Sequence, residues 1–316
     1  MKILVTGGAG FIGSNFVDYI LKHHQDYRVL VLDKLTYAGG VDNLRQAEDN
    51  PGFRFIQGDI CDQSLDDELV LDSDLVINFA AETHVDRSIQ TPDVFLHTNI
   101  LGTHCLLEAA RKHRKKFVQI STDEVYGSRD KGGFTEDDPL NPSSPYAASK
   151  AAADLLALSY HRTYGLPVKI IRCSNNYGPR QYPEKLLPLF ITRALRGERL
   201  PLYGDGLHHR EWTYVEDNCR AIDLILQKGK DGQIYNISSR AELANIQLIQ
   251  KVLRLLDKSE DLVEFVGDRP GHDRRYSLST KRLASLGWKP AFSLSQGLEL
   301  TVKWYLKNRD WWEKRL

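Results

Sequence analysis

The stretch Thr6-Gly7-Gly8-Ala9-Gly10-Phe11-Ile12-Gly13 decides the fold of this chain. It lies between a short apolar run, Ile3–Thr6, and an amphipathic segment, Ser14–Lys22, which the residue pattern predicts to be a strand and a helix. Glycines at 7, 10 and 13 allow a tight turn, and their missing side chains let backbone N–H groups and the helix N-terminus approach a pyrophosphate. A strand, a glycine turn and a helix in this order predict a dinucleotide-binding site.

Asp33 indicates which dinucleotide the turn would bind. It falls twenty residues after Gly13, at the end of the second predicted strand, Arg28–Asp33. A carboxylate at this place accepts hydrogen bonds from the hydroxyls of the adenosine ribose, whereas it repels a 2′-phosphate. The position therefore favours NAD over NADP. The alternative interpretation of Asp33 is a turn residue that only ends the strand.

The first two thirds of the chain alternate β-rich runs with helical segments, which is typical of a parallel sheet with helices on both faces. From about Tyr177 onward the chain is richer in Pro, Gly, Arg and aromatic residues, and the alternation ends. We therefore predict an α/β fold: a doubly wound parallel (Rossmann) sheet in residues 1–176, and a smaller mixed α/β C-terminal lobe in residues 177–316 that mainly binds substrate, with later segments returning to the sheet. The other predicted strands are Phe53–Gln57, Leu75–Phe79, Phe117–Ser121, Val168–Cys173 and Gln233–Ile237, and the other predicted helices are Asn99–His113 and Pro145–Tyr164.

Composition excludes several classes of function. The 316 residues include 42 Lys+Arg and 42 Asp+Glu, so no overall charge attracts the chain to nucleic acid or to an anionic membrane. No apolar run approaches the length of a membrane span or of a secretory signal, and we expect a cytoplasmic protein. The four cysteines are far apart and have no histidine at zinc spacing, so we expect reduced thiols and no metal site.

Two further pairs follow predicted strands, at the edge where an open parallel sheet binds its ligands. They are Asp59-Ile60 and Ala80-Ala81. Small residues at this edge leave room for a cofactor, although Ala80 and Ala81 are equally consistent with close packing between a helix and the sheet.

A candidate catalytic group lies farther along the chain. Thr122-Asp123-Glu124 ends the fifth predicted strand, and Tyr146 and Lys150 follow a Pro-rich turn at the start of a predicted helix. Residues four apart project from one helical face. An ammonium near a phenol stabilises the phenolate, so we expect Lys150 to lower the pKa of Tyr146 from about 10 toward neutrality and make it a base.

On these residues and several longer strings the chain resembles the extended short-chain dehydrogenases/reductases, and within them the dTDP-glucose 4,6-dehydratases. The resemblance covers essentially the whole length. The strings that carry the closer match are Asp33–Gly39, Ala80–Ser88, Thr122–Gly127, Ser174–Pro179, Pro183–Leu186 and Arg269–Tyr276.

The resemblance implies a hydro-lyase that holds NAD tightly and regenerates it in each turnover. Tyr146, kept as a phenolate by Lys150 and NAD⁺, would take the proton of the C4 hydroxyl while hydride passes from C4 to the nicotinamide. Thr122 would bind the 4-oxygen. Glu124 would then remove the C5 proton and Asp123 would protonate the departing C6 hydroxyl. Hydride would return to C6 while C5 is reprotonated. The product would be dTDP-4-keto-6-deoxyglucose.

The resemblance also implies the binding residues. The cofactor would contact Gly7, Gly10, Phe11, Ile12, Gly13, Asp33, Lys34, Leu35, Thr36, Asp59, Ile60, Ala80, Ala81, Thr98, Tyr146, Lys150 and Asn176. The sugar nucleotide would contact His84, Thr122, Asn175, Lys185, Leu186, Pro201, Tyr203, Arg210, Asn245, Asp268, Arg269, His272 and Tyr276.

Family members form homodimers through a four-helix bundle, for which Asn99–His113 and Pro145–Tyr164 are the matching segments. Two alternatives on the same scaffold stay open, a UDP-sugar 4-epimerase and a UDP-sugar 4,6-dehydratase. The adjacent carboxyls of Asp123 and Glu124 favour dehydration, because an elimination needs two further proton-transfer groups that an epimerisation does not. A non-catalytic NAD-binding regulator would lack the Tyr146/Lys150 pair.

Overall fold

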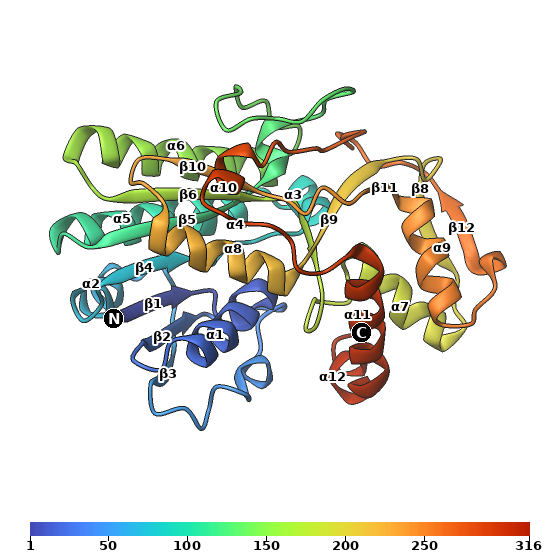
Figure 1. The fold of residues 1–316 in the computed structure, drawn as a ribbon, viewed down its shortest axis with the longest axis horizontal. Coiled ribbons are helices and arrows are strands. Elements are labelled where there is room, and N and C mark those ends of the chain that lie inside the picture. Colours follow the sequence, from blue (N-terminus) through green and yellow to red (C-terminus); the bar gives the residue numbers. More distant parts are fainter.

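Seven strands form one wholly parallel sheet in the computed structural model, which describes residues 1–316 (Figure 1). Their order across the sheet is β10-β6-β5-β4-β1-β2-β3. The central strands are apolar on both faces, because helices cover both sides of the sheet. Their bounds are β1 (Lys2–Thr6), β2 (Arg28–Asp33), β3 (Phe53–Gln57), β4 (Leu75–Asn78), β5 (Lys116–Thr122), β6 (Val168–Cys173) and β10 (Ile234–Ile237).

Two apolar clusters hold the helices against the sheet. On one face Phe16, Ile20 and Ile222 come from α1 (Phe11–His23) and α8 (Val215–Lys228). On the other face Leu106 and Tyr160 represent a cluster that joins α2 (Gln63–Leu71), α5 (Thr103–Lys112) and α6 (Pro145–Tyr164) to the sheet. This layered arrangement confirms the predicted doubly wound fold.

The segment between β4 and α5 departs from the predicted helix Asn99–His113. The short helices α3 (Val85–Gln90) and α4 (Asp93–Phe95) lead into a π-helical segment, Leu96–Gly102, and only then into α5. Asn99 shows why: its amide bonds the backbone N–H and carbonyl of Glu82 at 2.8 and 3.1 Å and the Ser149 hydroxyl at 2.8 Å. Periodicity along one segment does not reveal this tertiary anchoring.

The C-terminal part of the chain builds two small sheets and a separate apolar cluster, to the right in Figure 1. The chain crosses back to the large sheet and its helices twice, first with α8 and β10 and again with α10. The small sheets contain β7 (Asn175–Tyr177), β9 (His209–Tyr214) and β11 (Glu242–Ala244), and β8 (Leu200–Tyr203) with β12 (Val263–Val266). The helices around them are α7 (Leu186–Arg196), α9 (Asn245–Leu255), α11 (Leu294–Lys307) and α12 (Arg309–Glu313), and α10 (Lys281–Ser285) lies against β10.

The four cysteines are unpaired, and three of them are buried. No helix of the fold combines the length and the hydrophobicity that crossing a bilayer requires.

Asp66 is a buried acid that the fold leaves without a partner. It lies in the first turns of α2, is fully buried, and neither carboxyl oxygen accepts a hydrogen bond. Burial, with a smaller contribution from Asp62 and Asp59, raises the pKa of Asp66 to about 8. Below that pH the folded protein therefore keeps Asp66 protonated, whereas the unfolded chain releases the proton near pH 4.

We expect Asp66→Asn to stabilise the protein in a pH-dependent way. The folded pKa lies above the unfolded one, so the wild type loses stability as pH rises from about 4 to about 8, and the variant avoids that loss. The advantage should be absent at pH 4 and reach about 5 kcal/mol at pH 8, because each pKa unit corresponds to about 1.4 kcal/mol. Urea denaturation across this range measures it. An advantage that is equal at both ends would show that Asp66 does not titrate as inferred.

Candidate active site

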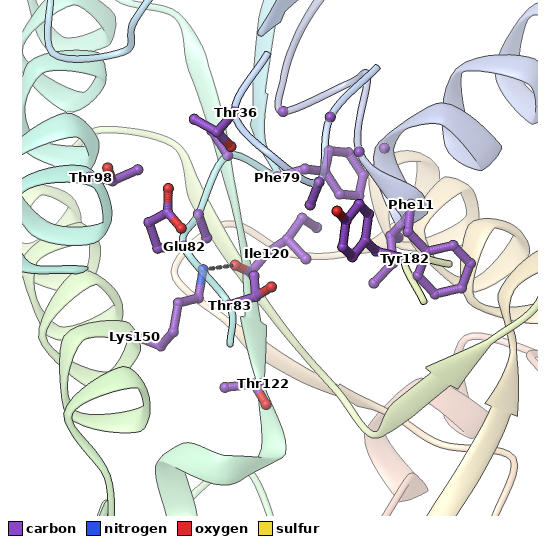
Figure 2. A pocket seen from close by; sticks show the side chains of 18 of the residues that line it. Phe11, Thr36, Phe79, Glu82, Thr83, Thr98, Ile120, Thr122, Lys150 and Tyr182 are labelled. Atoms are coloured by element: carbon purple, nitrogen blue, oxygen red, sulfur yellow. Dashed lines mark hydrogen bonds between the residues drawn. The ribbon is translucent and has the colours of Figure 1, made fainter. Parts of the chain in front are cut away.

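One elongated cavity runs along the carboxyl ends of the central strands. At one end it is lined by the glycine turn and by Asp59, and at the other by Glu124 and Lys185. Figure 2 shows Phe11, Phe79 and Tyr182 gathered on one side of it and Lys150, Ile120 and Thr122 on the other. The parallel sheet delivers all these segments to one edge, where a ligand can touch several of them.

The glycine turn packs too closely for side chains. Gly7 has φ +67°, and a Cβ there would lie 2.5 Å from the backbone nitrogen of Ala80. A Cβ on Gly13 would lie 2.3 Å from the Gly7 carbonyl oxygen. At Gly10 the nearest atom to a built Cβ is 3.3 Å away, and the residue faces the cavity. The turn therefore leaves backbone N–H groups without neighbouring side chains at the start of α1, and such groups can bind a pyrophosphate.

Asp33 holds this turn in place. Its two carboxyl oxygens accept hydrogen bonds from the backbone N–H groups of Ala9 at 2.9 Å and Leu35 at 2.8 Å. Burial raises the pKa of Asp33, and these two bonds oppose the rise. Each oxygen keeps a second lone pair for a ribose hydroxyl. Asp33 is thus a structural support of the turn in addition to the predicted ribose ligand.

The first turns of α6 place Tyr146 and Lys150 on one buried face. Pro145 occupies the first helical position, and the Ser144 hydroxyl caps the helix by accepting from the Ala147 N–H at 3.1 Å. The Lys150 ammonium donates to the Ile120 carbonyl of β5 at 2.7 Å (Figure 2). Burial lowers the pKa of Lys150 to about 8, against an opposing effect of Asp154.

Tyr146 differs from the expectation drawn from its spacing to Lys150. Burial, followed by the carboxyl of Glu124, raises its pKa well above the usual range. The Lys150 ammonium points to a backbone carbonyl, and two acidic residues face the phenol, so the protein alone keeps Tyr146 protonated. Forming a phenolate requires further positive charge in the cavity.

Asp123 and Glu124 leave β5 in a short 3-10 turn, Asp123–Tyr126, that Thr122 caps by accepting from the Glu124 N–H at 3.2 Å. Burial and then Glu124 raise the pKa of Asp123 well above its usual range, and one of its oxygens has no partner. Burial also raises the pKa of Glu124, but three cations oppose that rise: Arg269, Lys185 and Arg210. The two adjacent carboxyls thus lie in different environments, one suited to an acid and one to a base.

An ion pair lies behind these groups. Asp154, one helical turn beyond Lys150, accepts from the Nε of Arg172 on β6 at 2.9 Å, and both side chains are at most 2% exposed. The pair therefore provides a negative group near Lys150 without leaving a lone charge in the interior.

The cavity fits NAD. The carbonyl oxygens of the Asn175 and Asn176 side chains are buried and lack a hydrogen-bond partner, and both residues line the cavity. Together with the bare backbone at Gly10 and the carboxylate of Asp33, they match the donors and acceptors of a dinucleotide.

The structure brings most of the predicted cofactor residues to this cavity. Leu35 is the exception: it adopts φ +57° and packs against the core beside α1 instead. The predicted residues that line the cavity are Gly7, Gly10, Phe11, Ile12, Gly13, Asp33, Lys34, Thr36, Asp59, Ile60, Ala80, Ala81, Thr98, Thr122, Asp123, Glu124, Tyr146, Lys150, Asn175, Asn176 and Lys185.

The other predicted substrate residues lie outside the cavity lining. His84 caps α3, and Arg210 is buried with its guanidinium donating to the carbonyls of His209 and Asp273, each at 2.8 Å. A loop that contains Arg269 meets α3 through the pair Arg269–Asp86 at 3.3 Å. This second group consists of His84, Leu186, Pro201, Tyr203, Arg210, Asn245, Asp268, Arg269, His272 and Tyr276.

Sequence reasoning missed several residues that line the cavity. Glu82 and Thr83 directly follow the predicted pair Ala80-Ala81, and Tyr182 and Glu184 precede the predicted Lys185. These residues lie next to a strand end or next to a predicted site residue, and this proximity in sequence could have identified them as candidates. Their orientation toward the cavity depends on tertiary contacts that the sequence does not show.

Comparison with known proteins places these features in a family. Residues 4–301 match the family model described as GDP-mannose 4,6 dehydratase. The low-salt glycan biosynthesis protein Agl12 of Haloferax volcanii is 55% identical over 311 residues, which cover 98% of this chain and all of that protein. A dTDP-glucose 4,6-dehydratase of Streptomyces niveus is 52% identical over 319 residues, covering 99% of this chain and 95% of that protein.

The fold agrees equally well with a solved structure. DesIV, a dTDP-glucose 4,6-dehydratase of Streptomyces venezuelae crystallised with NAD and dTDP, superimposes with a TM-score of 0.98 at 50% sequence identity, and each chain is covered completely.

We expect Lys150→Met to make the cofactor-free protein more stable at pH 7 while abolishing turnover, because a buried ammonium is exchanged for an apolar side chain of similar length. The folded pKa of about 8 lies below the unfolded value of 10.5, so the penalty on the wild type is complete below pH 8 and disappears by pH 10.5. Thermal unfolding at pH 7 and pH 10 measures the difference. A variant that is less stable than the wild type at pH 7 would contradict this account.

Proposed function

Because the chain belongs to the GDP-mannose 4,6-dehydratase family, we propose that it is the NAD-dependent hydro-lyase that converts dTDP-glucose to dTDP-4-keto-6-deoxyglucose. Bound NAD supplies the acceptor and donor of hydride and, when oxidised, a positive charge in the cavity. The reaction as a whole consumes no reductant.

One observation carries the dehydratase assignment: Asp123 and Glu124 are adjacent but differently surrounded. The raised pKa of buried Asp123 keeps its proton available, which suits the acid that protonates a departing C6 hydroxyl. The three cations that oppose the raised pKa of Glu124 favour its carboxylate form, which suits the base that takes the C5 proton. An elimination needs this acid and base together.

The remaining roles are assigned to residues of the same cavity. Tyr146 must first lose its own proton to solvent, which the positive charge of oxidised NAD and the Lys150 ammonium, fixed by the Ile120 carbonyl, would favour. The resulting phenolate oxygen would then take the proton of the C4 hydroxyl. The Thr122 hydroxyl, which caps the acidic turn, binds the 4-oxygen of the sugar.

The diphosphate of the substrate needs local positive charge, since the chain as a whole is neutral. Lys185 lines the cavity beside Glu124, and Arg210 and Arg269, although outside the lining, are close enough to oppose the raised pKa of Glu124 together with it. We assign them to this diphosphate. Residues 1–176 would then bind mainly NAD, and residues 177–316 mainly the sugar nucleotide.

The assembly we propose is a homodimer built on α5 and α6. Apolar side chains lie exposed on and around these helices, among them Leu96, Leu101, Leu155 and Tyr164, each more than 40% exposed. Two helices from each subunit would cover them in a four-helix bundle. The four free thiols support a cytoplasmic location.

A UDP-sugar 4-epimerase is the competing function on this scaffold. It would give no role to Asp123, whose burial without a full set of partners destabilises the fold. A UDP-sugar 4,6-dehydratase would use the same groups and differ only in the base of the nucleotide.

Mass spectrometry of the products decides between these functions. The protein with NAD in heavy water should remove one water from dTDP-glucose, introduce deuterium at C5 and accumulate no NADH, and it should act more slowly on UDP-glucose. In the same assay Tyr146→Phe should block the first oxidation, whereas Asp123→Asn should still oxidise C4 but eliminate water about 10²–10⁴-fold more slowly. An unchanged mass with inversion at C4 would make the protein an epimerase.

The proposed dimer predicts the effect of a charge on its apolar face. Leu155→Glu should give a monomer in light scattering, because the carboxylate would be buried between the subunits. Leu306→Glu is the matched control: Leu306 is 53% exposed, Leu155 is 58% exposed, and Leu306 lies on α11 away from that face. Unchanged mass in Leu155→Glu would exclude this interface.

A further inference from the structure

Three side chains from three separate segments meet at the mouth of the cavity. Tyr37 lies in the loop after β2, Arg87 lies in α3, and Glu184 lies in the loop before α7. We refer to Tyr37, Arg87 and Glu184 as the clamp. None of them was predicted as a site residue, and the chemistry assigned above does not use them.

Each pair of the clamp is in contact. The Tyr37 hydroxyl donates to Oε1 of Glu184 at 2.7 Å, and the Arg87 guanidinium lies 3.3 Å from Oε2 of the same carboxylate. The guanidinium also lies over the Tyr37 ring, 3.7 Å from its centre. Burial and the carboxylate of Glu184 raise the pKa of Tyr37, so the hydroxyl remains a donor. A charge-assisted bond and a cation–π contact thus close one small ring of interactions.

The clamp joins the two rims of the dinucleotide cavity. On the first rim Thr36, Ala38 and Gly39, which flank Tyr37, line the cavity. On the second rim Tyr182 and Glu184 line it. The rings of Tyr37 and Tyr182 also meet edge to face at 5.3 Å, so the rims touch beside the hydrogen bond as well.

Both rims are anchored to rigid parts of the fold. The loop that carries Tyr37 continues to Gly40 and Asn43, which donate to the Ala9 carbonyl of the glycine turn at 3.2 and 2.7 Å. Next to Glu184, Lys185 donates to the Thr83 carbonyl at 2.7 Å. The clamp therefore links two anchored loops that border the cavity, and its opening would separate them.

We propose that Tyr37, Arg87 and Glu184 retain the dinucleotide in its cavity between the first and the last step of a turnover. The inference rests on the proposed function, since a reaction that removes hydride and later returns it fails if the reduced cofactor leaves in between. The clamp residues are positioning residues: they bind no reacting atom and act through the loops they join.

Cofactor retention measures this directly and needs no substrate. Protein loaded with NADH is mixed with excess NAD⁺, and the loss of bound-NADH fluorescence gives the dissociation rate. Tyr37→Phe, which removes only the hydroxyl, and Glu184→Gln, which removes the charge, should each release NADH at least tenfold faster than the wild type. Tyr27→Phe is the matched control, because Tyr27 stacks on His24 away from the cavity and should not change the rate.

A second readout separates retention from general damage. Each variant should unfold within a few degrees of the wild type, and turnover of Tyr37→Phe should decay after desalting and recover when NAD⁺ is added. Wild-type dissociation rates in both Tyr37→Phe and Glu184→Gln would overturn the proposal. The dissociation rates are measured without sugar nucleotide, so they test cofactor retention even if the product assay shows a different reaction. Conversely, wild-type dissociation rates in the variants would not change the result of the product assay.

Discussion

The burial of charge beside the carboxyl ends of β5 and β6 is the constraint on which the active site depends. Lys150 is 4% exposed, and a lone ammonium in such a place costs several kcal/mol. The fold offsets that cost with the Ile120 carbonyl on β5 and with Asp154, which Arg172 on β6 holds in turn. These partners exist only when α6 lies correctly on the two strands, so the position of the helix and the charge of the site are set together.

Much of this arrangement is readable from the chain. The bounds of β2, β3, β6 and α6 agree with the predicted ones, because short runs rich in β-branched and aromatic residues and a Ser-Pro helix start are local signals. The spacing of Tyr146 and Lys150 correctly predicts a shared helical face that lines the cavity. Local pattern suffices where a residue's neighbours in sequence are also its neighbours in space.

The sequence misleads where distant segments decide the outcome. The raised pKa of Tyr146 follows from its burial and from Glu124, which is close to it only in the folded chain. The positive φ of Leu35 turns a residue of a matching string away from the cavity. In each case a tertiary contact overrides the local expectation.

The π-helical segment Leu96–Gly102 ties the cavity to α5 through chain length. Thr98 lines the cavity, and the Asn99 side chain accepts a hydrogen bond from the backbone N–H of Glu82. Leu106, four residues after the segment, is fully buried against the sheet. Each residue of an α-helix advances the rotation by about 100°. Rewinding the segment as an ordinary helix without removing a residue would turn α5 by about that angle and take Leu106 off the sheet. The π-helical winding is therefore what lets Thr98 line the cavity while Leu106 stays buried on the sheet.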